Sequence, residues 1–264
     1  MDTSDDRKSD RDASGRGLRR DNLIVGLIHL AQVIVLVVLS NDFTLPMTES
    51  FLDGPPGLTT PGAPEVIWDL PLGYAVAFFL LLAAIDHLLM AAPGIWEWYS
   101  RNLGRGINYA RWWEYSVSAS LMAVLIAMLT GISDITALIG IFGANAAMIY
   151  FGMVMEIFNR PDDKEINWTP YLFGCVAGAV PWIAIGVALI GAQIESDGQV
   201  PTFVFGIFVS LFILFNSFAV NMVLQYKRVG KWRDYIFGER AYIVLSLTAK
   251  TALAWQIFAN TLID

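Results

Sequence analysis

Seven long apolar runs, separated by shorter polar connections, dominate the chain. The runs are Leu23–Ser40, Leu70–Ala92, Tyr109–Ile132, Ile135–Phe158, Pro170–Ile194, Pro201–Tyr226 and Ala241–Leu262. Each is long enough to cross a bilayer as a helix, because a helix rises about 1.5 Å per residue and a crossing takes about 20 mostly apolar residues. The pattern predicts an all-α membrane protein, built as a bundle of seven transmembrane helices.

Two polar stretches stand outside these runs. Residues 1–22 mix both charges with glycine and serine, and we expect them to form a disordered tail. Residues 41–69 are long for a connection between helices, and prolines and glycines break them into turns. We expect this loop to form short β-strands or an extended cover that serves as a lid or a subunit contact. Residues 23–264 then form a single transmembrane domain.

The positively charged residues predict the orientation of the chain. Sixteen of the 17 lysines and arginines lie on one side of a seven-span chain. They are Arg7, Lys8, Arg11, Arg16, Arg19, Arg20, Arg101, Arg105, Arg111, Arg160, Lys164, Lys227, Arg228, Lys231, Arg233 and Arg240. Because positive loops remain in the cytoplasm, the N-terminus is predicted there and Asp264 outside the cell. The loop 41–69 is then the first extracellular loop of a multi-pass cell-membrane protein.

The composition agrees with a membrane protein and excludes several other classes. Hydrophobic residues make up 56% of the chain, charged residues 16%, and the mean hydropathy is +0.54. The single cysteine rules out an intrachain disulfide, and two histidines are too few for a histidine-rich metal site. The sequence contains no phosphate-binding glycine loop, zinc-ligand spacing or basic nucleic-acid patch. We expect no metal, no nucleic-acid partner and no enzymatic activity.

The seventeenth basic residue, Lys250, interrupts the last apolar run near its middle. A free ammonium at that depth costs roughly 2.5–3.5 kcal/mol on insertion scales. A lysine that condenses with an aldehyde becomes a Schiff base, whose proton affinity depends on its surroundings. Ser246 lies one turn earlier on the same helix face, within reach of that nitrogen. The alternative is that Lys250 pairs with an acid for structural reasons, or extends its amine to the membrane surface.

Glu114 is the acid that the helix geometry brings to Lys250. The third and seventh runs begin on the same side, and Lys250 lies ten residues after Arg240, or about 15 Å along a helix. Because helical side chains lean toward the N-terminus, the amine and the carboxylate can meet between adjacent helices. A carboxylate within about 4–6 Å favours a protonated Schiff base. The alternative is an interfacial glutamate that pairs with Arg111 or Arg105.

His29 and His87 lie in the cytoplasmic half of their runs, near the depth of Glu114. We expect them to border a hydrated polar cavity that holds a proton released near Lys250. Asp86 points to a different helix face from His87, and it is a further candidate for that cavity. Each histidine equally suits a simple bond to a neighbouring helix. The same two interpretations hold for Asn108, Tyr115 and Asn145.

The extracellular half of the runs is apolar by contrast. Between mid-membrane and the outer loops, no run contains Asp, Glu, Lys, Arg or His, and Asp69, Asp134 and Glu195 lie at the boundaries. A protein that pumps protons across the membrane needs titratable groups on both sides of its switch. This pattern argues against pumping.

Aromatic and sulfur-containing side chains provide walls for a long, conjugated, apolar ligand. Trp255 lies five residues after Lys250, and Phe215 lies in the phenylalanine-rich sixth run. The other candidates for the walls are Trp112, Trp113, Met122, Met148 and Phe212. The alternative is that these side chains only pack helices together or face lipid.

Four motifs resemble one known family. WWEYS around Glu114, SLTAK ending at Lys250, the Asp86–His87 pair and the RNLGRGIN loop are similar to heliorhodopsins, which are microbial rhodopsins with an inverted membrane topology. The likeness covers nearly the whole chain after residue 22. It implies a rhodopsin-like bundle that binds retinal, all-trans in the dark, through a protonated Schiff base on Lys250. Glu114 is the counterion in this interpretation.

The resemblance also implies roles for other residues. Ser246 would hydrogen-bond near the Schiff base, and His29 and His87 would belong to the cytoplasmic cavity. The residues expected near them are Asn108, Tyr115, Asn145 and Trp255. The family is typically dimeric through the first extracellular loop, senses light and in general does not pump ions. We therefore expect a light sensor with transient proton release into the cytoplasmic cavity and an unidentified cytoplasmic signalling partner. The rival is a light-driven or light-gated proton or ion transporter.

Overall fold

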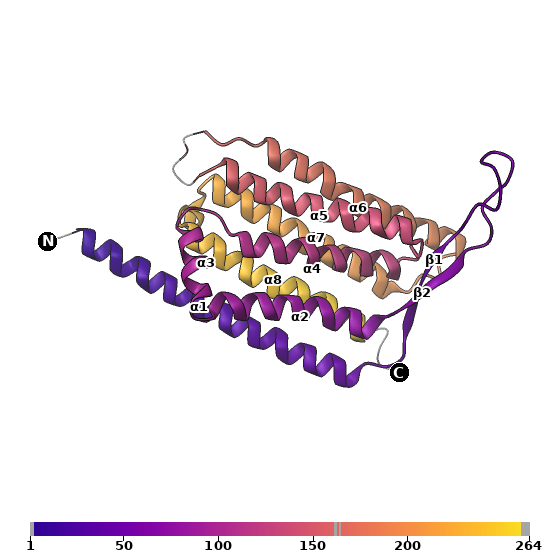
Figure 1. The fold of residues 1–264 in the computed structure, drawn as a ribbon, viewed down its shortest axis with the longest axis horizontal. Coiled ribbons are helices and arrows are strands. Elements are labelled where there is room, and N and C mark those ends of the chain that lie inside the picture. Colours follow the sequence, from indigo (N-terminus) through magenta and orange to yellow (C-terminus); the bar gives the residue numbers. More distant parts are fainter. Residues whose placement is uncertain (1–2, 161–162, 164, 260–264) are drawn as a thin grey trace.

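The computed structural model describes residues 3–160, 163 and 165–259. Within these residues, seven long helices lie side by side along one axis (Figure 1). They are α1 (Thr3–Leu39), α2 (Leu72–Ala91), α4 (Tyr109–Leu129), α5 (Ile135–Phe158), α6 (Thr169–Glu195), α7 (Thr202–Tyr226) and α8 (Tyr235–Ile257). The fold is therefore a bundle of helices, as the apolar runs predicted.

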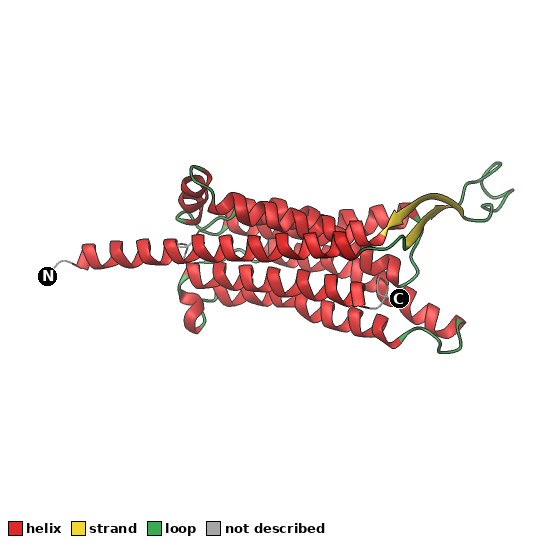
Figure 2. Cartoon of the chain, turned by 90° about the horizontal axis from the view of Figure 1, so that it is seen from below, coloured by secondary structure: helices red, strands yellow, loops and turns green. Residues whose placement is uncertain are grey.

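The two ends of the bundle differ. One end carries the short helix α3 (Ile95–Leu103), the 3-10 helix η1 (Gly230–Arg233) and the connection between α5 and α6, and we call it the α3 end. The other end carries a hairpin of β1 (Thr44–Glu49) and β2 (Glu65–Pro71), and we call it the hairpin end. Figure 2 shows α1 extending past the α3 end, and the hairpin projecting from the opposite end.

The described residues contain six helices that are long and apolar enough to cross a membrane, namely α1 from Gly15 onward, α2, α4, α5, α6 and α7. The chain is therefore a multi-pass membrane protein. α8 is not among the six, because Arg240, Ser246 and Lys250 make it more polar. It nevertheless packs in the same bundle against α1, α2 and α7. A seventh crossing stays a prediction, and the expected end of the last run, Leu262, lies outside the described residues.

The first helix begins earlier than the sequence indicated. Residues 3–22, expected to be disordered, continue α1 without a break. Their last turns pack on the bundle: Leu18 and Asn22 are buried, and the Arg19 Nε donates to the Ala91 carbonyl at 2.8 Å. Leu18 joins an apolar cluster with α3, so one helix face is buried although the stretch as a whole is polar. The expected boundary at residue 23 is therefore too late.

The β-hairpin is tied to the bundle through β1. The two strands pair antiparallel, with an irregularity between Met47 and Thr48. The Thr48 N–H donates to the Ser133 carbonyl at 2.8 Å, and the hydroxyls of the same two residues lie 2.9 Å apart. These bonds fix the hairpin to the connection between α4 and α5. The hairpin therefore has a defined position at this end of the bundle.

Asp134 caps the N-terminus of α5. Its carboxylate accepts the Thr136 hydroxyl at 2.6 Å and the Ala137 N–H at 2.8 Å. The hydrogen bond from the Thr136 side chain, followed by that from the Ala137 backbone, lowers the pKa of Asp134. A cap of this kind stabilises a protein by about 0.5–2 kcal/mol.

We expect Asp134→Ala to lower the thermal unfolding temperature, whereas Asp134→Asn, which can still cap, should stay close to the wild-type protein. Because the folded-state pKa is lowered, the ionic part of the stabilisation is present above the unfolded-state pKa and lost as the pH falls through the folded value. Unfolding curves at neutral and acidic pH measure both effects. Equal unfolding temperatures for the alanine and asparagine variants would contradict the capping role.

The interior of the bundle divides into an apolar part and a polar part. Toward the hairpin end, Phe79 from α2, Leu125 from α4 and Leu253 from α8 are fully buried. Buried charged side chains extend instead from the middle of the bundle to the α3 end. They are Arg111, Glu156, Glu239 and Lys250. The apolar part thus holds the helices together, while the polar part contains the groups capable of chemistry.

Candidate functional site

Lys250 and Glu114 form an ion pair in the middle of the bundle. The Lys250 Nζ on α8 donates to the Glu114 Oε1 on α4 at 2.6 Å. Both side chains are shielded, with 4% and 7% of their surfaces exposed. Removing two charges from water is costly, and the mutual attraction and the hydrogen bond offset that cost. The alternative, a Glu114 that pairs with Arg111 or Arg105, does not describe this structure. Glu114 pairs with Lys250, and Arg111 binds Glu156 and Glu239.

Tyr115 lies beside the ion pair. The Lys250 Nζ is 5.0 Å from the centre of the Tyr115 ring, which places the cation over an aromatic face. The Tyr115 hydroxyl donates to the Tyr242 carbonyl at 3.2 Å, so the ring is held between α4 and α8. Tyr115, expected near the site from the sequence, is thus in direct contact with it.

A cavity of about 480 Å³ lies between α4, α5, α6, α7 and α8, and Lys250 is one of the residues that line it. Its walls are mainly apolar and aromatic. The expected residues that line it are Trp112, Tyr115, Met122, Met148, Phe212, Phe215 and Ser246. Ser246 is buried one turn before Lys250, at the polar end of the cavity. This volume lies within the range of about 300–1,000 Å³ that is usual for pockets of small organic ligands.

Besides Glu114, three of the residues expected around the ligand do not line this cavity, namely Trp113, Trp255 and Asn145. The Trp113 side chain is 59% exposed on the outer surface of α4, where its ring meets Tyr150 edge-on. Trp255 packs against Phe258 near the hairpin end. Asn145 donates its side-chain N–H to the Ser120 hydroxyl at 3.1 Å, which is the interhelical bond considered as its alternative. Sequence spacing alone did not separate the inner from the outer helix faces, because both are apolar.

The α6 wall of the cavity was missed by the sequence analysis. The Trp182 ring meets Phe208, Phe212 and Phe215 edge-on, with ring centres 5.2–5.7 Å apart. One and two turns before Trp182, the small residues Gly178 and Gly174 also line the cavity. Small residues at helical spacing that lead to a tryptophan were the available signal for this wall.

A polar region extends from Lys250 toward the α3 end. The rings of His29 and His87 are stacked with their centres 6.0 Å apart, and the His87 Nδ1 lies 2.7 Å from the Asn22 Oδ1. Both ring nitrogens of the buried His29 lack a hydrogen-bond partner among the described residues. The structure thus brings the two expected histidines together, with Asn22 as an additional partner.

A second cavity, of about 20 Å³, lies in the polar region and is large enough for one water molecule. Its lining includes Asp86, His87, Asn108 and Tyr115. Asp86 was expected on a different helix face from His87, yet both residues border this space, because neighbouring positions can flank one narrow cavity. Tyr115 and Tyr242 line both this space and the large cavity.

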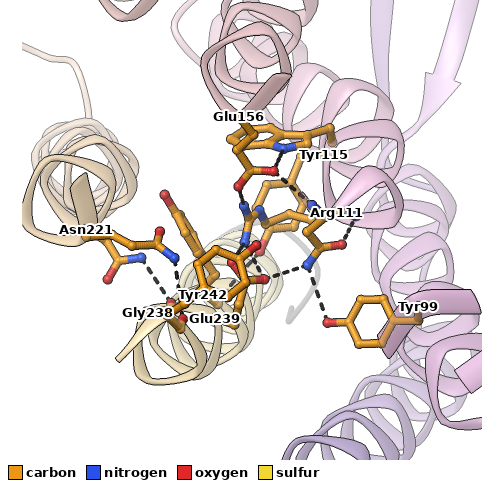
Figure 3. Close-up of polar contacts among 12 residues, drawn as sticks. Tyr99, Arg111, Tyr115, Glu156, Asn221, Gly238, Glu239 and Tyr242 are labelled. Atoms are coloured by element: carbon orange, nitrogen blue, oxygen red, sulfur yellow. Dashed lines mark hydrogen bonds and ion pairs between the residues drawn. The ribbon is translucent and has the colours of Figure 1, made fainter. Parts of the chain in front are cut away.

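A buried cluster around Arg111 is the main polar feature that the sequence did not predict (Figure 3). Arg111, counted among the surface arginines, is only 4% exposed. Its Nη1 donates to both carboxylate oxygens of Glu239 at 2.7 Å, and its Nη2 binds the Glu156 Oε1. The Asn108 side chain donates to the Glu239 Oε2 at 2.7 Å. The available signal was the position of Glu156 near the C-terminus of α5 and of Glu239 near the N-terminus of α8, because both helix ends lie with Arg111 at the α3 end of the bundle.

The comparisons with known proteins agree with this arrangement. The heliorhodopsin family profile matches residues 18–262. Among solved structures, the light-driven proton pump CsR from Coccomyxa subellipsoidea is similar with a TM-score of 0.65 and 19% identity, over 92% of this chain and 96% of that chain. The light-driven proton pump LR (Mac) from Leptosphaeria maculans gives 0.63 and 16%, over 93% and 95%. Halorhodopsin, a light-driven chloride pump, gives 0.61 and 13%, over 91% and 92%.

These structural similarities establish the fold alone, because each of the three structures is less than 25% identical to this chain. No curated protein sequence matches significantly. The family profile covers nearly the whole bundle, including Glu114 and Lys250, and it confirms the resemblance of the sequence motifs. The chain therefore belongs to the heliorhodopsin family.

Proposed function

We propose that this protein is a light sensor that binds retinal covalently through Lys250. One observation carries the proposal: the only lysine amine placed inside the described bundle lines a large, mainly apolar cavity and pairs with Glu114 at 2.6 Å. Membership of the heliorhodopsin family supports the same chromophore. Bound all-trans retinal would supply absorption of visible light and a change of shape on isomerisation.

The residues of the cavity fit this group. A covalent bond to an aldehyde requires an amine at one end, and Lys250 provides it. A long conjugated chain requires flat apolar walls, which Trp112 and Trp182 supply from opposite helices. The cavity volume of about 480 Å³ provides the space. Gly152 and Gly178 leave room for the Trp112 and Met148 side chains, which a Cβ at either glycine would overlap.

The residues around Lys250 control a proton on its nitrogen. In the dark, Glu114 stabilises the positive charge, and the Tyr115 ring adds a cation–π contact. When the nitrogen moves relative to Glu114, the proton loses its stabilising partner. His29 and His87 offer acceptors toward the α3 end, and His29 has unpaired ring nitrogens among the described residues. In the part of the chain that the structure describes, the hairpin half of the interior contains no buried histidine, aspartate or glutamate, so the proton leaves toward the α3 end and returns from there.

The proposed topology follows from the loop charges. The α3 end carries the basic loops and faces the cytoplasm, so the C-terminus lies outside the cell. α8 is the seventh crossing, because its two buried charges are both neutralised, Lys250 by Glu114 and Glu239 by Arg111. The hairpin end is then extracellular.

The proposed partners are a second copy of the chain and an unidentified cytoplasmic signalling protein. The hairpin loop exposes apolar side chains, including Leu58 and Trp68, which suit a homodimer contact in the extracellular space. A signalling protein would bind the α3 end, where the polar region lies closest to the surface. This function is sensory rather than enzymatic.

The rival function is light-driven or light-gated transport of protons or other ions, and the similarity to light-driven pumps favours it. We expect illuminated cells or vesicles that contain the retinal-bound protein to show no sustained pH change and no photocurrent, because among the described residues the buried histidines and glutamates lie on only one side of Lys250. The matched control is Lys250→Ala, which defines the signal without chromophore. A sustained light-dependent pH change above that control would contradict the sensor proposal.

A further inference from the structure

Trp112 connects the large cavity to the Arg111 cluster. Its ring lines the cavity, and its indole N–H donates to the Glu156 Oε2 at 2.6 Å. The Arg111 guanidinium lies over the same ring, 4.7 Å from its centre. The ring also lies against Gly152 on α5, where a Cβ would overlap it. The wall that Trp112 forms is therefore held by its edge and by its face.

Hydrogen bonds hold the Glu156 carboxylate in place beside the Trp112 ring. The carboxylate is buried, and both of its oxygens accept hydrogen bonds. The Oε1 accepts from the Arg111 Nη2, and the Oε2 accepts from the Trp112 indole and from the Asn108 backbone N–H at 2.9 Å. Because three donors from α4 and its N-cap meet on this group from α5, the carboxylate cannot rotate without losing one of them.

The same cluster reaches the helix of Lys250. Arg111 binds Glu239 on α8 with Nη1, and its guanidinium lies over the Tyr242 ring at 3.9 Å. Tyr242 lines the large cavity as well. The cluster thus fixes two cavity walls, Trp112 and Tyr242, although it makes no hydrogen bond to Lys250 or Glu114 among the described contacts.

We propose that Glu156 is a positioning residue for the chromophore, which sets the absorption maximum by holding the Trp112 ring against the cavity. This inference rests on the proposed retinal-binding function. Glu156 acts through the Trp112 N–H, and Arg111 keeps the carboxylate in place. The position of the Trp112 ring would limit the conformations open to the bound chromophore, and the absorption maximum would depend on that conformation.

The test compares Glu156→Gln, Trp112→Phe and the double variant, each purified with retinal. Gln keeps the size of Glu156 but replaces one acceptor oxygen with an N–H₂ donor. In one orientation of the amide the Arg111 Nη2 loses its acceptor, and in the other orientation the Trp112 indole and the Asn108 N–H lose theirs. Phe keeps an aromatic wall and removes only the indole N–H donor and part of the ring. The matched control is Glu195→Gln, an exposed glutamate at the C-terminal end of α6.

We expect both single variants to shift the absorption maximum, the double variant to shift it no further than the larger single shift, and Glu195→Gln to leave it unchanged. An unshifted Glu156→Gln band, or a double shift equal to the sum of the single shifts, would overturn the inference. If Glu156→Gln does not fold, Trp112→Phe decides: a shifted band supports the inference and an unshifted band overturns it. A colourless wild-type protein would contradict the proposed function instead.

A second readout needs no retinal. In a proton–nitrogen correlation spectrum of the retinal-free, ¹⁵N-labelled protein, the Trp112 indole proton should resonate downfield, because the indole N–H donates a short hydrogen bond to a carboxylate. Trp112→Phe identifies the resonance by its loss. We expect Glu156→Gln to move it upfield and Glu195→Gln to leave it in place. If the indole resonance had the same chemical shift in Glu156→Gln as in the wild-type protein, the Trp112 and Glu156 side chains would not be coupled.

Discussion

Lys250→Ala should remain colourless after incubation with retinal, whereas the wild-type protein should develop a visible absorption band. Lys250 supplies the amine in the described cavity that can form a Schiff base with an aldehyde, and alanine offers no nucleophile. Absorption spectra of the purified, retinal-treated proteins measure the effect. The matched control is Lys227→Ala, which removes an exposed lysine at the C-cap of α7 and should keep the band.

The same substitution should also destabilise the protein in the absence of retinal. Removing Lys250 leaves the Glu114 carboxylate shielded and uncompensated, and breaking a buried ion pair typically costs about 3–5 kcal/mol. The double variant Lys250→Ala/Glu114→Gln removes both charges and should recover most of that stability. Thermal unfolding separates the two effects. A visible band that persists in Lys250→Ala would exclude this lysine as the attachment point.

Glu114→Gln should change the spectrum of the retinal-bound protein and its dependence on pH. The neutral amide leaves the positive charge at Lys250 without its partner in a shielded site. A loss of about 3–5 kcal/mol changes the protonation equilibrium by more than about a hundredfold. The nitrogen then either loses its proton, which moves the band to the near ultraviolet, or stays protonated with a shifted visible band.

Spectra of Glu114→Gln recorded across a pH range decide the role of this residue. Glu195→Gln is again the matched control, because it removes a carboxylate that lies away from the cavity. It should match the wild-type protein at every pH. If Glu114→Gln also matched the wild-type spectrum and titration, Glu114 would not be the counterion.

The sequence predicted the helices well because transmembrane segments must be both long and apolar. It placed the start of the first helix too late, since residues 15–22 are polar by composition. Their burial depends on a few contacts, such as Leu18 against α3, and not on average hydropathy. The ends of a membrane helix are thus set by local packing that composition does not reveal.

The pairing of Lys250 with Glu114 was predictable, because helix rise fixes the depth of each residue and buried charges need partners. The Arg111 cluster was not, because arginines and glutamates near helix ends usually lie at the surface. Which aromatic residues line the cavity was predictable only in part. Trp112 faces the cavity and Trp113 faces outward. An apolar sequence pattern does not distinguish a helix face that contacts a ligand from one that contacts lipid.

The most direct test of the central claim is to locate the attachment of retinal on the chain. The retinal-treated protein is reduced with borohydride, which makes the bond to the amine permanent, and its peptides are analysed by mass spectrometry. We predict a retinyl group on the peptide that contains Lys250. A protein that takes up no retinal, or a retinyl group on another lysine, would contradict it.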